Sequence, residues 1–170
     1  MVNKDLIILG MIFLMPSHGY QLKKNIRDTF GNPYFKINNN VLYPALAKME
    51  KNGLIEGKEE PGKGINKKVY NITKKGQEHL LELVAQPAKP GIDNFDFMVQ
   101  VVFFDYISKE KRQNAIRPLY ESKKQELVLT LEKKDKYGDI MSPISLMVLE
   151  FGINEIKSSI SFFERLLELD

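Results

Sequence analysis

The sequence contains no cysteine and no tryptophan, and only two of its 170 residues are histidine. Without cysteine the chain can form no disulfide, no thiolate zinc site and no cysteine nucleophile. His18 and His79 are far apart in the sequence and have no carboxylate at metal-ligand spacing, so a histidine-based metal site is not expected. We therefore predict no metal, no cofactor and no catalytic residue.

The sequence also lacks a long hydrophobic run. The only candidate targeting segment, Leu6 to Met15, is about ten residues long, whereas a bilayer-spanning helix needs about 20 apolar residues. The run ends in Pro16-Ser17-His18 rather than at a small-residue cleavage site. We expect a buried helix here and a cytoplasmic protein without membrane contact.

An excess of one charge is nearly absent, because the formal net charge is only +3. The charge is unevenly distributed, however. Residues 1–86 contain 13 Lys and Arg against 8 Asp and Glu, a net +5, which leaves 12 basic and 14 acidic residues, a net −2, in residues 87–170. A locally basic region favours a polyanionic partner, so a polyanion is expected to bind the N-terminal half.

The N-terminal half reads as three helices, a β-hairpin and a fourth helix. Pro16 stops the first helix and Ser17 is a candidate N-cap for a second, residues 18–29. In the third helix Leu42, Leu46 and Met49 follow i, i+4, i+7 spacing, and Gly53 ends it. Residues 54–60 and 67–72 read as two strands, and Thr73 can cap a helix that ends near residue 85. This order is that of a winged helix-turn-helix module.

The third helix has the composition of a recognition helix. Opposite its apolar residues it carries hydrogen-bonding and cationic side chains. Asparagine can pair bidentately with adenine, whereas lysine and tyrosine more often contact phosphate. Asparagine is also a common N-cap, so capping and base contact are equally open for each member of the run. The candidate DNA-binding residues here are Asn38, Asn39, Asn40, Tyr43 and Lys48.

The hairpin loop resembles a DNA-contacting wing. Lys63, Lys67 and Lys68 are placed to reach phosphates or the minor groove, although a solvated charged turn has the same composition. The loop also contains G-x-x-x-x-G-K at residues 57–63. A glycine follows where a magnesium-binding Ser or Thr belongs, and a strand follows instead of a helix. Nucleotide hydrolysis is therefore not expected, and the chain is not predicted to be an enzyme.

The C-terminal half is helical in pattern after a Pro/Gly-rich linker. We predict a winged helix DNA-binding domain over residues 1–86, a linker over 87–91 and a helical dimerisation domain over 92–170. The fold class is thus mainly α with a small β-hairpin. The predicted helices are an apolar one from Phe95 to Ile107, a long one capped by Ser108 that ends near Tyr137, and a last one that begins at Ser142-Pro143.

The last helix carries a regular apolar seam whose members step alternately by three and four residues, the spacing of a coiled coil. We predict that this seam pairs two copies of the chain. The alternative is that the seam packs against Leu127 and Leu131 of the same chain. The seam consists of Leu146, Leu149, Ile153, Ile156, Ile160, Phe163 and Leu167.

An apolar cluster just after the linker is a candidate effector pocket for a hydrophobic or phenolic small molecule. The alternative is that these residues are core, which is the usual role of an apolar stripe at helical spacing. The cluster consists of Phe95, Met98, Val102, Phe103 and Phe104.

Four sequence blocks resemble the PadR family of winged helix-turn-helix transcriptional regulators. They are His18-Gly19-Tyr20, Val41-Leu42-Tyr43-Pro44-Ala45-Leu46, Met49 to Ile55 and Lys68 to Gly76. The helical C-terminal half is more loosely similar to that of the longer, AphA-like members.

The resemblance implies a homodimeric repressor, or sometimes an activator, that binds an inverted repeat in double-stranded DNA near promoters. It also implies that Tyr20 and Tyr43 contact the DNA backbone or brace the recognition helix. Lys23 of the second helix joins this predicted DNA-binding set. With Asn40 as N-cap, Pro44 would fall near the first helical turn, where a missing N–H is tolerated. A module of the same fold that binds protein instead of DNA is the alternative function.

Overall fold

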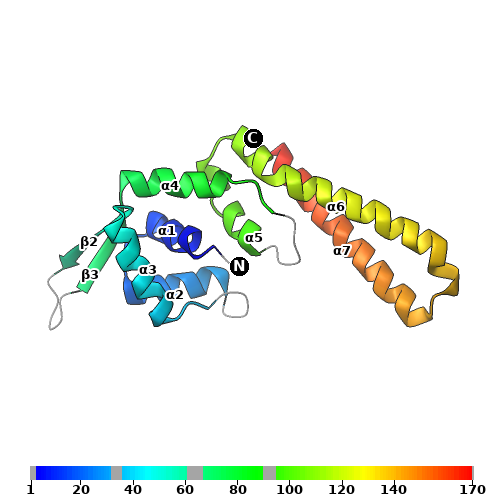
Figure 1. Cartoon of the computed structure of the whole chain (residues 1–170), viewed down its shortest axis with the longest axis horizontal. Helices are drawn as coiled ribbons and strands as arrows, with labels where there is room; N and C mark the ends of the chain where they lie inside the picture. Colours follow the sequence, from blue (N-terminus) through cyan, green and yellow to red (C-terminus); the bar gives the residue numbers. More distant parts are fainter. Residues whose placement is uncertain (1–2, 32–35, 61–66, 90–94, 170) are drawn as a thin grey trace. The chain divides into compact units, whose positions relative to one another are not determined.

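The computed structural model describes residues 3–31, 36–60, 67–89 and 95–169. It is mainly helical with a small antiparallel sheet (Figure 1). The chain divides into two compact units. The first unit comprises Met1–Val84 and Phe95–Tyr106, and the second comprises Ala85–Asn94 and Ile107–Asp170.

The first unit is built around its most apolar helix, α1 (Lys4–Leu14), in which every residue from Leu6 to Ile12 is buried. This confirms the expected buried helix. None of the described helices is long and apolar enough to cross a membrane. The other elements of this unit are β1 (Ser17–His18), α2 (Gly19–Phe30), α3 (Asn39–Lys51), β2 (Ile55–Glu60), β3 (Lys67–Ile72), α4 (Lys74–Ala85), α5 (Phe95–Val101) and the 3-10 turn η1 (Phe104–Tyr106).

The third helix, α3, forms as its pattern predicts. Leu42, Leu46 and Met49 are its buried residues, with 0 to 2% of their surface exposed. Gly53 ends the helix with a φ of 71°, and the Leu54 N–H donates to the Met49 carbonyl at 2.9 Å. This is the Schellman bond that a left-handed glycine makes possible.

The sheet has three strands in the order β1-β3-β2, all antiparallel. The hairpin pairs Ile55 with Ile72 and Glu60 with Lys67. The third strand was not predicted, because the sequence prediction made Ser17 the N-cap of the second helix. Ser17 instead pairs with Tyr70 of β3, and its hydroxyl donates to the Met15 carbonyl at 2.8 Å. The N-cap of α2 is His18, whose side chain makes no capping bond.

The apolar segment after the linker forms a shorter helix than predicted. Helix α5 ends at Val101 instead of continuing to Ile107, and a 3-10 turn follows. Phe103 is fully buried against α1, where a Cβ on Gly10 would lie only 2.2 Å from Phe103 Cζ. Residues 95–106 therefore belong to the first compact unit, whereas the predicted boundary places them in the C-terminal domain.

The second unit is an antiparallel helical hairpin of α6 (Lys109–Tyr137) and α7 (Pro143–Glu168), joined through the 3-10 turn η2 (Gly138–Ile140). The two long helices lie side by side (Figure 1). Both predicted serine caps are present. Ser108 Oγ accepts from Lys111 N at 3.4 Å and Ser142 Oγ from Ser145 N at 3.2 Å.

Candidate nucleic-acid interface

Helix α3 presents a continuous exposed face opposite its buried residues. The first part of this face is polar, the middle is small and the end is cationic. The small residues leave space for a partner to approach the helix axis. The longer amide, hydroxyl and ammonium side chains on either side can then contact that partner. The exposed residues are Asn39, Asn40, Tyr43, Pro44, Ala47, Lys48 and Lys51.

The three asparagines before and within the first turn of α3 have different environments. Asn38 is the N-cap, but only its backbone carbonyl is used, accepting from Val41 N at 3.0 Å and Leu42 N at 2.9 Å. Asn39 Oδ1 accepts from Lys23 Nζ at 2.9 Å, which links α2 to α3. Asn40 is exposed. Side-chain capping at Asn38, the alternative role, is therefore absent from this structure.

Pro44 lies deeper in α3 than the sequence prediction assumed. The N-cap is Asn38 and not Asn40, so the proline is inside the helix beyond its first turn. Proline has no N–H, and the carbonyl four residues earlier, that of Asn40, therefore lacks its α-helical donor. Asn40 and Pro44 are both exposed residues of the helix.

A hollow of about 530 Å³ lies where the start of α2, α3 and β3 meet. Tyr20 is 79% exposed and Tyr43 46%. Gly19 makes this arrangement possible, because a Cβ there would come 2.7 Å from the Tyr43 ring. Burial raises the pKa of Tyr70. The hollow is lined by His18, Gly19, Tyr20, Gln21, Tyr43, Lys68 and Tyr70.

Glu50 at the end of α3 holds the hairpin, a role that the sequence prediction missed. Its carboxylate accepts from Lys68 Nζ at 2.8 Å and from Gly57 N at 3.1 Å. The hydrogen bond from Lys68 is the main reason why the pKa of Glu50 is lowered. Gly57 leaves room for the lysine, since a Cβ there would lie 2.0 Å from Lys68 Cε. Finding this contact requires the hairpin register, which the sequence pattern does not give.

The other predicted wing residues are only partly described. Lys68 is exposed but paired with Glu50, so it is both a hairpin brace and a candidate DNA contact. Lys67 is opposite Glu60 in the hairpin register, and Lys63 lies outside the described residues. Lys48 is exposed in the last turn of α3. The structure thus brings Tyr20, Lys23, the asparagines, Tyr43, Lys48 and Lys68 together on the first unit.

The candidate effector residues do not share one environment. Phe103 and Phe104 are buried, with exposed fractions of 0 and 4%, whereas Met98 and Val102 are about half exposed. Phe95 contacts Phe30 of α2 edge-on, with ring centroids 6.1 Å apart. The buried phenylalanines are core residues of the first unit, which is the alternative role named above.

The predicted dimer seam is largely covered within one chain. Ile153, Ile156 and Phe163 are buried, and Leu146, Leu149, Ile160 and Leu167 are intermediate. Helices α6 and α7 pack together in the second unit, so the seam serves its own helical hairpin. A different apolar stripe of α7 is exposed, made of Ile144, Met147, Val148 and Phe151.

The order of helices, the three-stranded sheet and the exposed face of α3 define a winged helix-turn-helix protein. Residues 8–82 match the model of the transcriptional regulator PadR-like family. A solved transcriptional regulator from Clostridium thermocellum is 32% identical over 46% of this chain and 76% of its own, with a TM-score of 0.42. The chain belongs to the PadR-like family of transcriptional regulators.

Two further solved structures are similar to the chain. The PadR-like transcriptional regulator BC4206 from Bacillus cereus is 33% identical over 46% of this chain and 74% of its own, with a TM-score of 0.40. Bacillus subtilis PadR, solved in complex with operator DNA, is 21% identical over 96% of both chains, with a TM-score of 0.47. No curated protein matches the chain significantly.

Proposed function

We propose that this PadR-like regulator is a homodimeric repressor that binds an inverted-repeat operator in double-stranded DNA. The exposed face of α3 carries the proposal. Asn40, Tyr43 and Lys48 lie on that face, while the buried face fixes the helix in the first unit. A helix so anchored can enter the major groove with its amide and ammonium groups toward the bases and phosphates.

Each group has a distinct role in the proposal. Asn40 reads a base edge, because its side chain is exposed and the N-cap of α3 is Asn38, not Asn40. Asn39, held by Lys23, fixes the first turn of the helix, and Asn38 lies beside it. The phosphate contacts come from Tyr20, Tyr43, Lys48 and the wing residues Lys63, Lys67 and Lys68. Repression follows from occlusion of RNA polymerase at the operator.

The proposed dimer uses the exposed stripe of α7. Ile144, Met147, Val148 and Phe151 follow i, i+3, i+4, i+7 spacing, and each is 66 to 75% exposed. A contiguous exposed apolar stripe is unfavourable in water and is typical of a protein interface. A second copy that covers the same stripe would tether two recognition helices, and the half-sites read by such a dimer lie in successive major grooves, about 34 Å apart. The seam from Leu146 to Leu167 supports this interface from within each protomer.

The proposal also includes release by a small molecule. A hydrophobic or phenolic effector would bind near Met98 and Val102, which are 47 and 43% exposed. A thermal-shift series with phenolic acids and apolar drugs measures this directly. We expect a rise in melting temperature with at least one compound, and reduced operator binding with the same compound. A series without any shift would contradict the effector.

Selection of bound genomic fragments with the purified protein identifies the operator and tests the function. We then expect Asn40→Ala to cost about 1 to 3 kcal/mol of binding free energy on the selected site and little on random DNA. Lys157→Gln, an exposed change on α7, is the control. Equal losses on both DNAs would refute base reading, and absence of DNA binding by the wild type would favour a protein-interaction module.

A further inference from the structure

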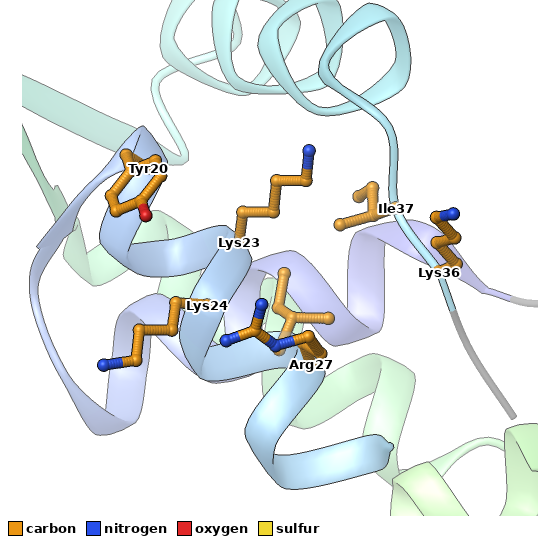
Figure 2. A pocket seen from close by; sticks show the side chains of 7 residues that line it. Tyr20, Lys23, Lys24, Arg27, Lys36 and Ile37 are labelled. Carbon is orange, nitrogen blue, oxygen red and sulfur yellow. The ribbon is translucent and has the colours of Figure 1, made fainter. Parts of the chain in front are cut away.

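A second hollow, of about 270 Å³, lies on α2 beside the segment that leads into α3 (Figure 2). Its rim is cationic and its floor apolar, since Ile26 and Ile37 are buried, with exposed fractions of 1 and 4%. Of the residues that line it, only Tyr20 lies in one of the four sequence blocks that resemble the PadR family. The hollow is lined by Tyr20, Lys23, Lys24, Ile26, Arg27, Lys36 and Ile37.

The sequence explains why the cations gather here. Tyr20, Lys23, Lys24 and Arg27 follow i, i+3, i+4, i+7 spacing, which places them along one side of α2. The buried residues of the helix are Gly19, Leu22 and Ile26. Lys36 comes from the chain before α3 and adds a fourth positive charge.

These cations are only partly neutralised within the described residues. Arg27 Nε is 3.1 Å from Asp28 Oδ1, but both side chains are about half exposed, so this pair is weak. Lys23 donates to an uncharged amide, that of Asn39. Lys24 and Lys36 are exposed. The hollow therefore carries a net positive charge that an anionic partner can neutralise.

The positions of the charged ends favour an extended anion over a compact one. Lys23 extends toward α3, whereas Lys24 and Lys36 lie at opposite sides of the hollow (Figure 2). A single phosphate needs donors that converge on one point. Charges spread along a rim match successive phosphates of a strand instead.

We propose that this hollow, called the α2 hollow, binds backbone phosphates of the DNA that flanks the groove occupied by α3. The inference rests on the proposed function and extends its contact surface. Two links join the hollow to the recognition surface. Tyr20 lines both hollows, and Lys23 is hydrogen-bonded to Asn39 in the first turn of α3. A strand that runs past the start of α3 therefore passes the α2 hollow.

The test compares Lys24→Gln/Lys36→Gln with a matched control, Lys133→Gln/Lys157→Gln, in the full-length protein. All four lysines are exposed, and each double variant removes two charges. Binding to a fluorescent 30-base-pair duplex of random sequence is measured by anisotropy at several salt concentrations. We expect the log–log salt slope of the first variant to fall by about 0.9 for each phosphate lost, hence by about 2 per protomer. The control should keep the wild-type slope.

Three results would decide against the α2 hollow. The first is a wild-type slope in Lys24→Gln/Lys36→Gln while Lys48→Gln binds more weakly, which leaves the proposed function intact. The second is an equal loss of slope in the control variant. The third is that inorganic pyrophosphate stabilises the wild type but not the double variant, while the salt slope of DNA binding is the same for both. This result would assign the hollow to a free anion. Failure of the wild type to bind any DNA would instead refute the proposed function.

Discussion

The two compact units differ in what their exposed faces are made of. In the first unit the apolar side of α3 is buried, and its exposed side carries amide, hydroxyl and ammonium groups. In the second unit α7 buries one apolar seam and exposes another, in which Ile144 is 75% and Phe151 66% exposed. The first unit is therefore suited to a charged, hydrated partner and the second to an apolar one.

The largest expected effect comes from making the exposed apolar stripe of the second unit charged, as the exposed surface of the first unit is. Met147→Glu/Phe151→Glu places two charges in the exposed stripe of α7, and we expect it to convert the proposed dimer to a monomer. Binding to a two-half-site operator should then fall by about 100-fold, because the second half-site is no longer tethered. Light scattering and anisotropy measure the two effects.

The control for this variant is Lys157→Glu, an exposed change on the same helix. It should leave both mass and affinity unchanged. A wild-type protein that is monomeric at micromolar concentration, or a dimer that survives the double substitution, would contradict the assignment of the stripe.

A pair of glycine substitutions contrasts the packing of the two units. Gly10→Ala should destabilise the protein by about 1 to 3 kcal/mol, because its Cβ would lie 2.2 Å from the fully buried Phe103 ring. Gly152→Ala in α7 has no atom within 4 Å of the added Cβ and should stabilise by about 0.5 to 1 kcal/mol. Urea denaturation measures both, and similar signs for the two variants would refute the packing argument.

A smaller effect distinguishes the two roles of Lys68. If its main role is to brace the hairpin through Glu50, Glu50→Gln should weaken DNA binding by about two- to fivefold, as expected for one partly exposed ion pair. We expect this result, and a double variant Glu50→Gln/Lys68→Met no weaker than Lys68→Met alone. An increase in affinity in Glu50→Gln would instead mean that phosphate contact, and not bracing, is the main role of Lys68 and that the glutamate restrains it.

The smallest expected effect is on the pH dependence of stability. The pKa of Glu50 is lowered by the hydrogen bond from Lys68, so the folded state binds this proton less tightly than the unfolded state. The stabilisation is present above the ordinary glutamate pKa and is lost as pH falls through the lowered value. The difference in urea midpoint between wild type and Glu50→Gln should therefore shrink from pH 7 to about pH 3. A constant difference would contradict the pairing.

Local signals predicted much of the fold because they act over a few residues. The spacing of Leu42, Leu46 and Met49 defined α3, Gly53 its end, and Ser108 and Ser142 the starts of the long helices. These features need no knowledge of distant neighbours.

The features that the sequence did not reveal depend on distant contacts. Strand β1 has only two residues and exists because Ser17 meets Tyr70. Helix α5 ends early where Phe103 packs on Gly10. The Glu50–Lys68 contact depends on the hairpin register and on the space at Gly57. In the candidate site, residue types could be predicted but not which cation is already paired.

Pro44 has a consequence for how this surface can be mapped. Pro44 has no N–H, so it donates no α-helical hydrogen bond to the carbonyl of Asn40, an exposed residue of α3. A base amino group could bind this oxygen, and such recognition would come from the main chain. An alanine scan across Asn40, Tyr43 and Lys48 removes every side chain and leaves the acceptor in place. Only a substitution of Pro44 itself restores an N–H that can donate to this carbonyl.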